Sequence, residues 1–577
     1  MLTNKDIAKV LSHIAFYLEM QDDHFRIRAY EHAAETLYAL TEEAADIYAH
    51  GGIAALEDIP GVGESIAEKI EELLKTGKLR YYDQLAQKIP ITIDELSGLE
   101  GLGAKRIKVL YKKLGVKDLA GLEHAAKAGK IAKLEGFGTK SEKNILQAIA
   151  FYRASHTRFL LSDVVSLVEG IAKKLGQVDG VTKVMVAGSI RRRKETVGDG
   201  DILAVSTKPK KVIDYFTAMD NVAAVYGKGD TKGAVKLRNG MDIDLRVVPA
   251  ESFGAALNYF TGSKDHNVAL RQIAIKKKMK LNEYGLFKGK KMVAGKTEEE
   301  VYRALGLQYV EPEMRENRGE IEAARKGILP QLIGYHDLKG DLQVQTSWTD
   351  GSNSIKEMAL AAQKAGLQYI VVTDHTKALA MTGGLDEKGL RKQAKEIDRV
   401  NKELSGITVL KGAEVNILKD GSLDISDEAL AQLDVVGAAV HTQFRLPREE
   451  MTARLIRAME NPHLDILFHP TARLINKREP IDVDMGAIIA AAVRTGTILE
   501  IDAIPDRLDL KDEYILQAKK AGAKFAIDSD AHNRDHFGFL WYGIAQARRG
   551  WLEPKDVINT LYLQEMLKCL KGGGKKR

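Results

Sequence analysis

Two short Asp-x-Asp segments place the strongest constraint on how this chain of 577 residues folds. Asp199 and Asp201 lead into the apolar run 202–205 (Ile-Leu-Ala-Val), and Asp242 and Asp244 lead into a second run of the same kind. On an extended segment, side chains two residues apart leave the same face. Three or four carboxylates gathered on one sheet face would repel one another unless a cation lay between them. Hard oxygen ligands of this kind select Mg²⁺, so the pattern predicts a two-metal site for phosphoryl transfer.

A glycine-serine turn stands before the first pair. The run 184–187 (Val-Met-Val-Ala) is apolar and predicts a buried strand that delivers Gly188 and Ser189 to this turn, with Arg191 and Arg192 directly after it. Backbone N–H groups at such a turn can bind a phosphate. An isolated Asp-x-Asp pair is usually a solvated strand face, but its combination with the turn and the arginines favours a functional site.

Composition describes an ordinary globular protein, with 45% hydrophobic and 29% charged residues, and the length allows three or four domains. No apolar window long enough to span a membrane is present, and the first residues lack a signal-peptide pattern. We therefore expect a cytoplasmic protein with no membrane partner, and a monomer by default. The single cysteine, Cys569, excludes a disulfide within the chain and any cysteine-based zinc finger.

Positive charge is unevenly spread. The formal net charge is +6, and residues 231–300 alone hold 14 basic and 8 acidic residues. Without other observations, such a run is read as a solvated face. Beside a nucleotide-handling site, the same charge would contact nucleic-acid phosphates.

The N-terminal region repeats one turn. The segments 59–63 (Ile-Pro-Gly-Val-Gly), 99–103 (Leu-Glu-Gly-Leu-Gly) and 134–138 (Leu-Glu-Gly-Phe-Gly) each precede a helix-like run with basic residues. A Gly-x-Gly turn lets backbone amides at a helix N-terminus approach a phosphate without obstruction by side chains. One such turn could be a simple helix connector, but the repetition predicts sequence-independent DNA binding through helix-hairpin-helix motifs.

Together these motifs resemble the nucleotidyltransferase signature, and from residue 1 to about 315 the chain resembles family X DNA polymerases, the group of DNA polymerase beta. The resemblance implies a lyase-like domain binding 5′ phosphates (1–85), helix-hairpin-helix fingers (86–155), a nucleotidyltransferase palm (156–250) and a thumb contacting the nascent base pair (251–315). It also implies gapped or nicked DNA with a 5′ phosphate, and dNTPs, as partners.

The resemblance assigns roles to individual residues. It implies that Asp199, Asp201 and Asp244 hold two Mg²⁺ ions, and that Asp244 accepts the proton of the primer 3′ hydroxyl. The residues that it places around the incoming nucleotide are Arg158, Gly188, Ser189 and Arg192 at the triphosphate, Tyr259, Phe260 and Gly262 at the sugar, and Asn267 and Arg271 beside the nascent base pair. Asp242 departs from the family pattern, because the eukaryotic relatives have an arginine there.

Lys69 lies where the family has the Schiff-base lysine of its deoxyribose-phosphate lyase. A lysine acts as a nucleophile only when its pKa is depressed, so the sequence leaves open whether Lys69 is that nucleophile or an exposed helix lysine. Ser65 replaces an expected basic residue, and Phe25 takes the place of a phosphate-contacting histidine. Binding of a DNA 5′ phosphate is therefore the firmer expectation for this domain.

After a connector at 316–335, residues 336–570 alternate strand-like and helix-like runs and predict a parallel barrel. This region resembles the polymerase and histidinol phosphatase (PHP) domain of bacterial family X polymerases, and most of its motifs follow predicted strands. The resemblance implies ligands for Mn²⁺ or Zn²⁺, with Asp350, His375 and His532 at one metal, Glu414, His441 and His469 at another, and Asp530 as a further ligand.

The first PHP motif departs from the family pattern. The family has a His-x-His pair, and this chain has Gln343 and Gln345 instead. An amide oxygen is a much weaker ligand than imidazole, so one metal should be lost or loosely held. We expect the 3′-5′ exonuclease and abasic-site cleavage of such domains to be reduced or absent; the rival is a two-metal site with residual hydrolysis.

The predicted fold is therefore multidomain: α-helical N-terminal domains with helix-hairpin-helix motifs, an α+β palm and thumb, and a C-terminal α/β, distorted TIM-like PHP barrel. The leading function is a DNA-templated, gap-filling DNA polymerase in DNA repair of the base excision type. The alternatives are an active exonuclease or phosphoesterase with residual metals, against which the glutamines argue, and a non-catalytic DNA-binding scaffold, against which the carboxylate trio argues.

Overall fold

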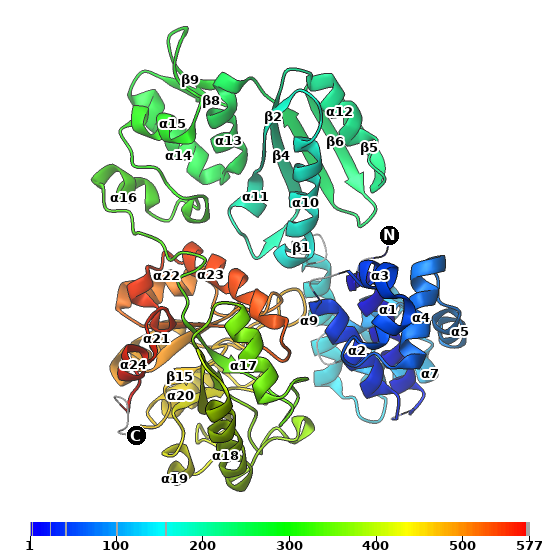
Figure 1. The fold of residues 1–577 in the computed structure, drawn as a ribbon. Coiled ribbons are helices and arrows are strands. Elements are labelled where there is room, and N and C mark those ends of the chain that lie inside the picture. The colour runs from blue at the N-terminus through cyan, green and yellow to red at the C-terminus, as the bar shows by residue number, and fades with distance from the viewer. Residues whose placement is uncertain are drawn as a thin grey trace.

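The computed structural model describes residues 2, 4–23, 25–40, 43–99, 102–155 and 158–572. Figure 1 shows a body of helices at the N-terminus in blue, a sheet-containing region in cyan and green, and a barrel-like region running from green to red at the C-terminus. Within the described ranges, no helix has both the length and the apolar character needed to cross a membrane. The expected multidomain fold is confirmed.

The N-terminal body consists of helices around one apolar core that extends from Ile7 to Tyr152. The helices are α1 (Asn4–Met20), α2 (Ile27–Ala39), α3 (Ala44–Glu57), α4 (Glu64–Thr76), α5 (Arg80–Lys88), α6 (Ile93–Ser97), α7 (Ala104–Leu114), α8 (Leu119–Lys127) and α9 (Thr139–Ser155). The amphipathic pattern of α1 explains its place in this core, since its apolar positions Ile7, Leu11 and Ile14 are fully buried.

The Gly-x-Gly turns lead into helices α4, α7 and α9, as predicted. Gly61 and Gly136, the first glycines of two turns, both have φ +79°, a conformation that a residue with a Cβ atom rarely adopts. Gly63 and Gly103 have extended backbones and form the N-caps of α4 and α7. Gly101, the first glycine of the second turn, lies outside the described residues.

A five-stranded sheet with the order β2-β4-β7-β6-β5 forms the palm. Its strands are β2 (Val181–Val186), β4 (Asp199–Ser206), β5 (Val222–Lys228), β6 (Lys232–Leu237) and β7 (Asp242–Val247). The strand pair β1 (Phe159–Leu160) and β3 (Thr196–Val197) and the helices α10 (Leu161–Gly176), α11 (Gly188–Arg191) and α12 (Pro209–Thr217) complete this region. Strands β4 and β7 run parallel, with Asp199 opposite Asp242 and Asp201 opposite Asp244.

Strand β2 forms where the apolar run 184–187 predicts it, but it is not buried. It lies at the edge of the sheet, and Met185 is 38% exposed. An edge strand has a partner on one side only, so apolar side chains in a short run do not by themselves place a strand in the interior.

The thumb follows the palm. Its elements are η1 (Ala250–Ser252), α13 (Phe253–Thr261), α14 (Lys264–Lys276), β8 (Lys280–Asn282), β9 (Gly285–Lys288), β10 (Lys291–Ala294), α15 (Glu298–Leu305) and η2 (Pro312–Met314). Helix α16 (Glu320–Lys326) falls within the expected connector 316–335. Glu320 at its start is fully buried and pairs with His266 of α14 at 2.6 Å, so this segment packs on the thumb.

The C-terminal region is a sheet of seven parallel strands in sequence order. The strands are β11 (Gly340–Val344), β12 (Tyr369–Val372), β13 (Thr408–Asn416), β14 (Val435–Ala439), β15 (Ile466–Leu467), β16 (Ile498–Asp502) and β17 (Phe525–Asp528). A parallel bridge between Val344 and Ala531, just beyond β17, brings the first and last strands together, which gives a nearly closed barrel.

Helices connect the barrel strands and cover their outer faces (Figure 1). The helices between strands are α17 (Ile355–Lys364), α18 (Glu387–Glu403), α19 (Asp427–Leu430), α20 (Arg448–Met459), α21 (Met485–Thr495) and α22 (Asp512–Ala521), and α23 (Leu540–Arg549) packs beside them after the last strand, with short 3-10 turns η3 (Ala380–Thr382), η4 (His536–Phe539) and η5 (Pro554–Asp556). The final elements, η6 (Ile558–Thr560) and α24 (Leu563–Lys568), instead pack Ile558 and Met566 in a separate cluster with Leu342, Val371 and Phe468 of the barrel. The buried β-branched residues of the strands explain why they form a parallel sheet covered by helices.

Candidate functional site

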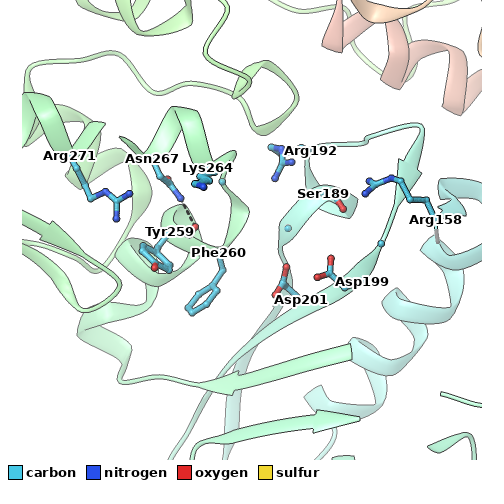
Figure 2. Close-up of a pocket in the computed structure, with 13 residues that line it drawn as sticks. Arg158, Ser189, Arg192, Asp199, Asp201, Tyr259, Phe260, Lys264, Asn267 and Arg271 are labelled. Carbon is cyan, nitrogen blue, oxygen red and sulfur yellow. Dashed lines mark hydrogen bonds between the residues drawn. The ribbon is translucent and has the colours of Figure 1, made fainter. Parts of the chain in front are cut away.

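A pocket of about 410 Å³ lies between the start of β4 and helices α13 and α14 (Figure 2). Its lining holds Asp199, Asp201 and all nine residues that the sequence places around a nucleotide, namely Arg158, Gly188, Ser189, Arg192, Tyr259, Phe260, Gly262, Asn267 and Arg271. Gly198 and Lys264 also line it. The sequence reasoning missed Lys264, although its position between Gly262 and Asn267 was a usable signal.

The turn before β4 requires a glycine. Gly188 has φ +64°, and a Cβ atom built on it would lie 2.4 Å from Oδ2 of Asp201. The backbone of the turn therefore lies too close to the Asp201 carboxylate for any residue with a Cβ atom. Next to it, the Oγ atom of Ser189 is buried and has no hydrogen-bond partner. A buried hydroxyl without a partner is costly unless a ligand satisfies it, so this atom fits a phosphate-binding role.

The carboxylates gather as the Asp-x-Asp spacing predicts. Burial, reinforced by the negative charges of Asp199 and Asp244, raises the pKa of Asp201 to about 7. A divalent cation would relieve the repulsion among these three carboxylates. Because all the ligand atoms they offer are oxygens, the three residues fit Mg²⁺. Asp244 does not line the pocket, and Lys232 lies 3.8 Å from its carboxylate. Asp242 pairs with Lys236 at 3.0 Å, which leaves a trio of acids rather than four.

Each of two pocket arginines is fixed by neighbours. Arg158 donates from Nε and Nη2 to the hydroxyl and the carbonyl of Thr196, at 3.0 and 2.7 Å. Arg192 donates from Nε to Glu316 at 3.1 Å and from Nη1 to the carbonyl of Thr261. Arginines held in place next to a phosphate-binding turn form a positive site for a polyanionic ligand.

Helices α13 and α14 form the opposite wall. The rings of Tyr259 and Phe260 meet edge to face with centroids 5.1 Å apart. Asn267 donates to the carbonyl of Tyr259 at 2.6 Å, and its Oδ1 atom is buried with no partner. Figure 2 shows Arg271 and Lys264 on the same wall, facing the carboxylates across the pocket. The walls thus offer stacking surfaces and unpaired polar groups opposite a cluster of acids.

Lys69 lies away from this pocket, on α4. Its Nζ atom donates to the carbonyl and the hydroxyl of Ser65 at 2.8 and 2.9 Å, and it lies 5.4 Å from the centroid of Tyr81. Burial lowers the pKa of Lys69, and the positive charge of Arg26 adds to this effect. Tyr30 stacks on Tyr81 at 6.5 Å. The lysine is therefore half-buried beside Tyr81, and the charges of Glu68 and Glu72 oppose the effect of Arg26 on its pKa.

The candidate ligands of the barrel lie at the C-terminal ends of the strands. His375 lies 3.4 Å from Asp350 and 3.3 Å from Glu414. His441 and His469 each place Nε2 at 2.9 Å from Oε1 of Glu414. Two groups have the spacing of a metal site within the described ranges, and these are Asp350, His375 and His532, and His375, Glu414 and His441.

The two glutamines of the first PHP motif are fully buried in the same barrel. Gln345 donates from Nε2 to Oε2 of Glu414 at 2.8 Å, where a metal ligand would instead direct a lone pair to an ion. Among the described residues, both amide atoms of Gln343 lack a hydrogen-bond partner, and Oδ1 of Asp530 lacks one too, although it lies 3.8 Å from Nδ1 of His532. Polar atoms left unsatisfied in this way fit a site built around an ion that the amides hold poorly.

Comparisons with known proteins match several parts of the chain. Family models match a DNA polymerase beta thumb at residues 256–316, a helix-hairpin-helix domain at residues 2–79, and a SAM-like helix-hairpin-helix tandem at residues 93–150. The chain is 37% identical over 572 residues to the DNA polymerase/3′-5′ exonuclease PolX of Bacillus subtilis (strain 168), which covers 98% of this chain and 99% of that protein.

Other relatives match either half. DNA polymerase lambda of Rattus norvegicus is 26% identical over 349 residues, 54% of this chain and 56% of that protein. A probable phosphatase of Thermoanaerobacter sp. (strain X514) is 34% identical over 218 residues, 36% of this chain and 84% of that protein. One of these relatives is named a polymerase and the other a phosphatase, so each is similar to only one part of the chain.

Proposed function

The chain belongs to the family X DNA polymerases that carry a C-terminal PHP domain, and from this membership and the pocket geometry we propose that it is a DNA-templated polymerase that fills short gaps during base excision repair. The observation that carries the proposal is the convergence of nine candidate nucleotide-binding residues and two acids in one pocket. The helix-hairpin-helix turns would hold the DNA backbone, and the basic thumb would contact the template.

The pocket residues divide the work of nucleotide transfer. Ser189, the backbone of Gly188 and the two arginines bind the triphosphate, and Tyr259 and Phe260 contact the sugar. Asp199, Asp201 and Asp244 would hold two Mg²⁺ ions, which would supply charge stabilisation at the attacking and leaving oxygens. The primer 3′ oxygen forms a bond to the α-phosphorus, the bond from this phosphorus to the bridging oxygen breaks, and pyrophosphate leaves. Asp244 accepts the proton of the 3′ hydroxyl.

Primer extension on a gapped duplex with a 5′ phosphate tests this proposal. The wild type should add one nucleotide opposite the template base in the presence of Mg²⁺, and an Asp244→Ala variant should lose this activity. Undiminished extension by the variant, or none by the wild type, would contradict the polymerase proposal. Binding of gapped DNA without extension in either protein would instead favour the non-catalytic scaffold.

We infer a deoxyribose-phosphate lyase role for Lys69 from its lowered pKa and its half-buried position beside Tyr81. A neutral amine would attack C1′ of the sugar, displace its hydroxyl as water and form a Schiff base. Borohydride trapping on an incised abasic substrate should give a covalent adduct that a Lys69→Ala variant no longer forms. No adduct with the wild type would leave this domain with 5′-phosphate binding alone.

We propose that hydrolysis in the barrel is reduced or absent. The hydrogen bond from Gln345 to Glu414 supports this, because it places an amide N–H against a candidate ligand oxygen. A Gln343→His, Gln345→His double variant should digest single-stranded 3′ ends with Mn²⁺ at least about tenfold faster than the wild type. Equal rates would favour the alternative, an active exonuclease that works with the two remaining metal groups.

A further inference from the structure

Arg192, one of the proposed triphosphate ligands, is held by a carboxylate from outside the palm. Its Nε atom donates to Oε1 of Glu316 at 3.1 Å, and Glu316 lies just beyond the thumb. Its Nη1 atom donates to the carbonyl of Thr261. Among the described residues, Nη2 has no hydrogen-bond partner, so this nitrogen is left for a ligand in the pocket.

Arg549, the last residue of barrel helix α23, binds the same carboxylate oxygen. Its Nη1 atom lies 3.0 Å from Oε1 of Glu316 and 2.7 Å from the carbonyl oxygen of Arg192. Its Nη2 atom donates to Asp512 at 2.6 Å. The side chain of Arg549 is 2% exposed, and that of Glu316 is 12% exposed. Figure 1 shows α23 on the side of the barrel that faces the palm and thumb.

The charges of this cluster depend on one another. Against the effect of burial, the charges of Arg549 and Arg192 lower the pKa of Glu316. The carboxylate is therefore ionised and lies between two guanidinium groups. Removing either partner of a buried pair leaves an uncompensated charge, so the arrangement is strongly specified.

A fixed Arg192 also matters for binding. An arginine side chain loses considerable rotamer freedom when a ligand immobilises it, and an interaction that immobilises it beforehand reduces this cost. Glu316 holds the guanidinium and Arg549 holds both Glu316 and the backbone of Arg192. The backbone contact lies directly after α11, the turn that carries Gly188 and Ser189.

We propose that Glu316 and Arg549 are positioning residues for nucleotide binding, through which the barrel sets the orientation of Arg192 before the nucleotide arrives. This inference rests on the proposed nucleotide-binding role of the pocket. It gives the barrel a function in polymerisation that does not depend on its metal ligands, and that persists when hydrolysis in the barrel is lost.

Single-nucleotide insertion kinetics with the full-length protein test the inference. In Glu316→Gln and Arg549→Lys variants, the KM for the dNTP should rise about tenfold, the effect of losing a charge-assisted hydrogen bond, while kcat changes by less than about twofold. The Kd for gapped DNA should stay unchanged. In a double variant, the rise in KM should be smaller than the product of the two single effects, because the two residues share one contact in the cluster that holds Arg192.

Arg548→Lys is the matched control. Arg548 is the neighbour of Arg549 on α23 and also crosses to the thumb side, where it binds Glu313 at 2.7 Å and the carbonyl of Ile333 at 2.8 Å, but it contacts neither Glu316 nor Arg192. The KM of the Arg548→Lys variant for the dNTP should equal that of the wild type. An equal rise in this control would mean general disruption of the interface, and an unchanged KM in Glu316→Gln would overturn the inference.

Direct binding separates this inference from the proposed function. Calorimetry with Mg²⁺ and a dNTP in the absence of DNA should show tight binding by the wild type and about tenfold weaker binding by Glu316→Gln. If the wild type binds the dNTP but extends no primer, the polymerase proposal fails while the positioning role stands. If the wild type binds no dNTP, both fail. Melting temperatures of the variants identify any that are simply unfolded.

Discussion

Gly188 lets the glycine-serine turn lie against the acidic cluster because it has no Cβ atom. A Cβ atom there would lie 2.4 Å from Oδ2 of Asp201, and the φ of +64° already disfavours a side chain. Gly198 lines the same pocket, but a Cβ atom on it would only meet Arg158 at 3.5 Å. The two glycines therefore have very different tolerance, although both are small residues beside the same acids.

We predict that Gly188→Ala lowers kcat/KM for nucleotide insertion by more than about 100-fold, because the added Cβ atom would displace the Asp201 carboxylate from its proposed position as a Mg²⁺ ligand. The cost in folding stability should be on the order of 1–2 kcal/mol. Gly198→Ala should keep most of the activity. Steady-state insertion kinetics and urea unfolding of the two variants measure both quantities, and equal losses of activity in the two would contradict the argument.

The lowered pKa of Lys69 predicts how its reactivity depends on pH. Only the neutral amine attacks, and while the pH is below the pKa of the lysine, its neutral fraction rises about tenfold per pH unit. Burial and the charge of Arg26 lower that pKa and so raise the neutral fraction at a given pH. The rate of borohydride-trapped adduct formation should therefore rise from pH 6 to pH 8.

An Arg26→Ala variant supplies the control for this pH dependence. Arg26 contacts the hydroxyl of Tyr81 at 3.2 Å, and its charge is one cause of the lowered pKa of Lys69. Without that charge, the pH profile should shift towards higher pH. A profile that is flat in the wild type, or unshifted in the variant, would mean that Lys69 is not the nucleophile.

At the scale of the elements, the junction of palm and thumb depends on one carboxylate at the start of α15. Glu298 binds Arg191 of α11 at 2.6 Å and Arg315, just after η2, at 2.6 Å. The side chain of Arg315 is fully buried. Two guanidinium groups from different elements therefore share one carboxylate, so the orientation of the thumb relative to the glycine-serine turn depends on Glu298.

We predict that Glu298→Gln destabilises the protein by about 3–5 kcal/mol, because it leaves buried positive charge uncompensated. Against the effect of burial, Arg315 and Arg191 lower the pKa of Glu298 to about 2. A lowered folded pKa adds stability that is fully present above the ordinary pKa and is lost as the pH falls towards 2. Urea unfolding at pH 7 and pH 3 should show a smaller difference between variant and wild type at pH 3. The exposed neighbour Glu299→Gln should cost less than about 0.5 kcal/mol.

The elements show which parts of the fold could be predicted from the sequence. Alternation of apolar and acidic residues predicted strands β4 and β7 with their acidic side chains on one face of the sheet. In the structure, Asp201 lies opposite Asp244 in the two strands. Short apolar runs placed β12 and β14 to β17, because such runs are sufficient for buried parallel strands. The burial of β2 was predicted wrongly, because an apolar run carries no information on whether a strand has one neighbour or two.

At the scale of the whole molecule, the contacts that the sequence could not predict join distant segments. The nine pocket residues were assigned through the resemblance to family X polymerases, and the structure brings them together in one pocket. Arg549 and Arg192 are 357 positions apart, and Gln345 and Glu414 are 69 positions apart, so no local pattern indicates their hydrogen bonds. Arginines such as Arg549 are also common on helix surfaces, and only the packing of α23 against the thumb distinguishes this one.

The proposed DNA-binding surface also extends over several elements. Its positive charge predicts how DNA binding depends on salt. The Gly-x-Gly turns before α7 and α9 are each followed by a basic residue in the first helical turn, and these residues, Lys105 and Lys140, are both exposed. Phosphate contacts release counterions, so affinity for duplex DNA falls with salt by about 0.9 logarithmic units per contact for each tenfold rise in salt. A Lys105→Ala, Lys140→Ala double variant should therefore reduce this slope by about 2 and weaken binding at low salt.

Because neither lysine lines the nucleotide pocket, kcat at saturating DNA should stay within about twofold of the wild type. The same charge change at Lys173 and Lys174, exposed residues of α10, controls for net charge. If that control reduces the slope equally, the turns do not direct the binding, and the affinity comes from the overall positive charge alone.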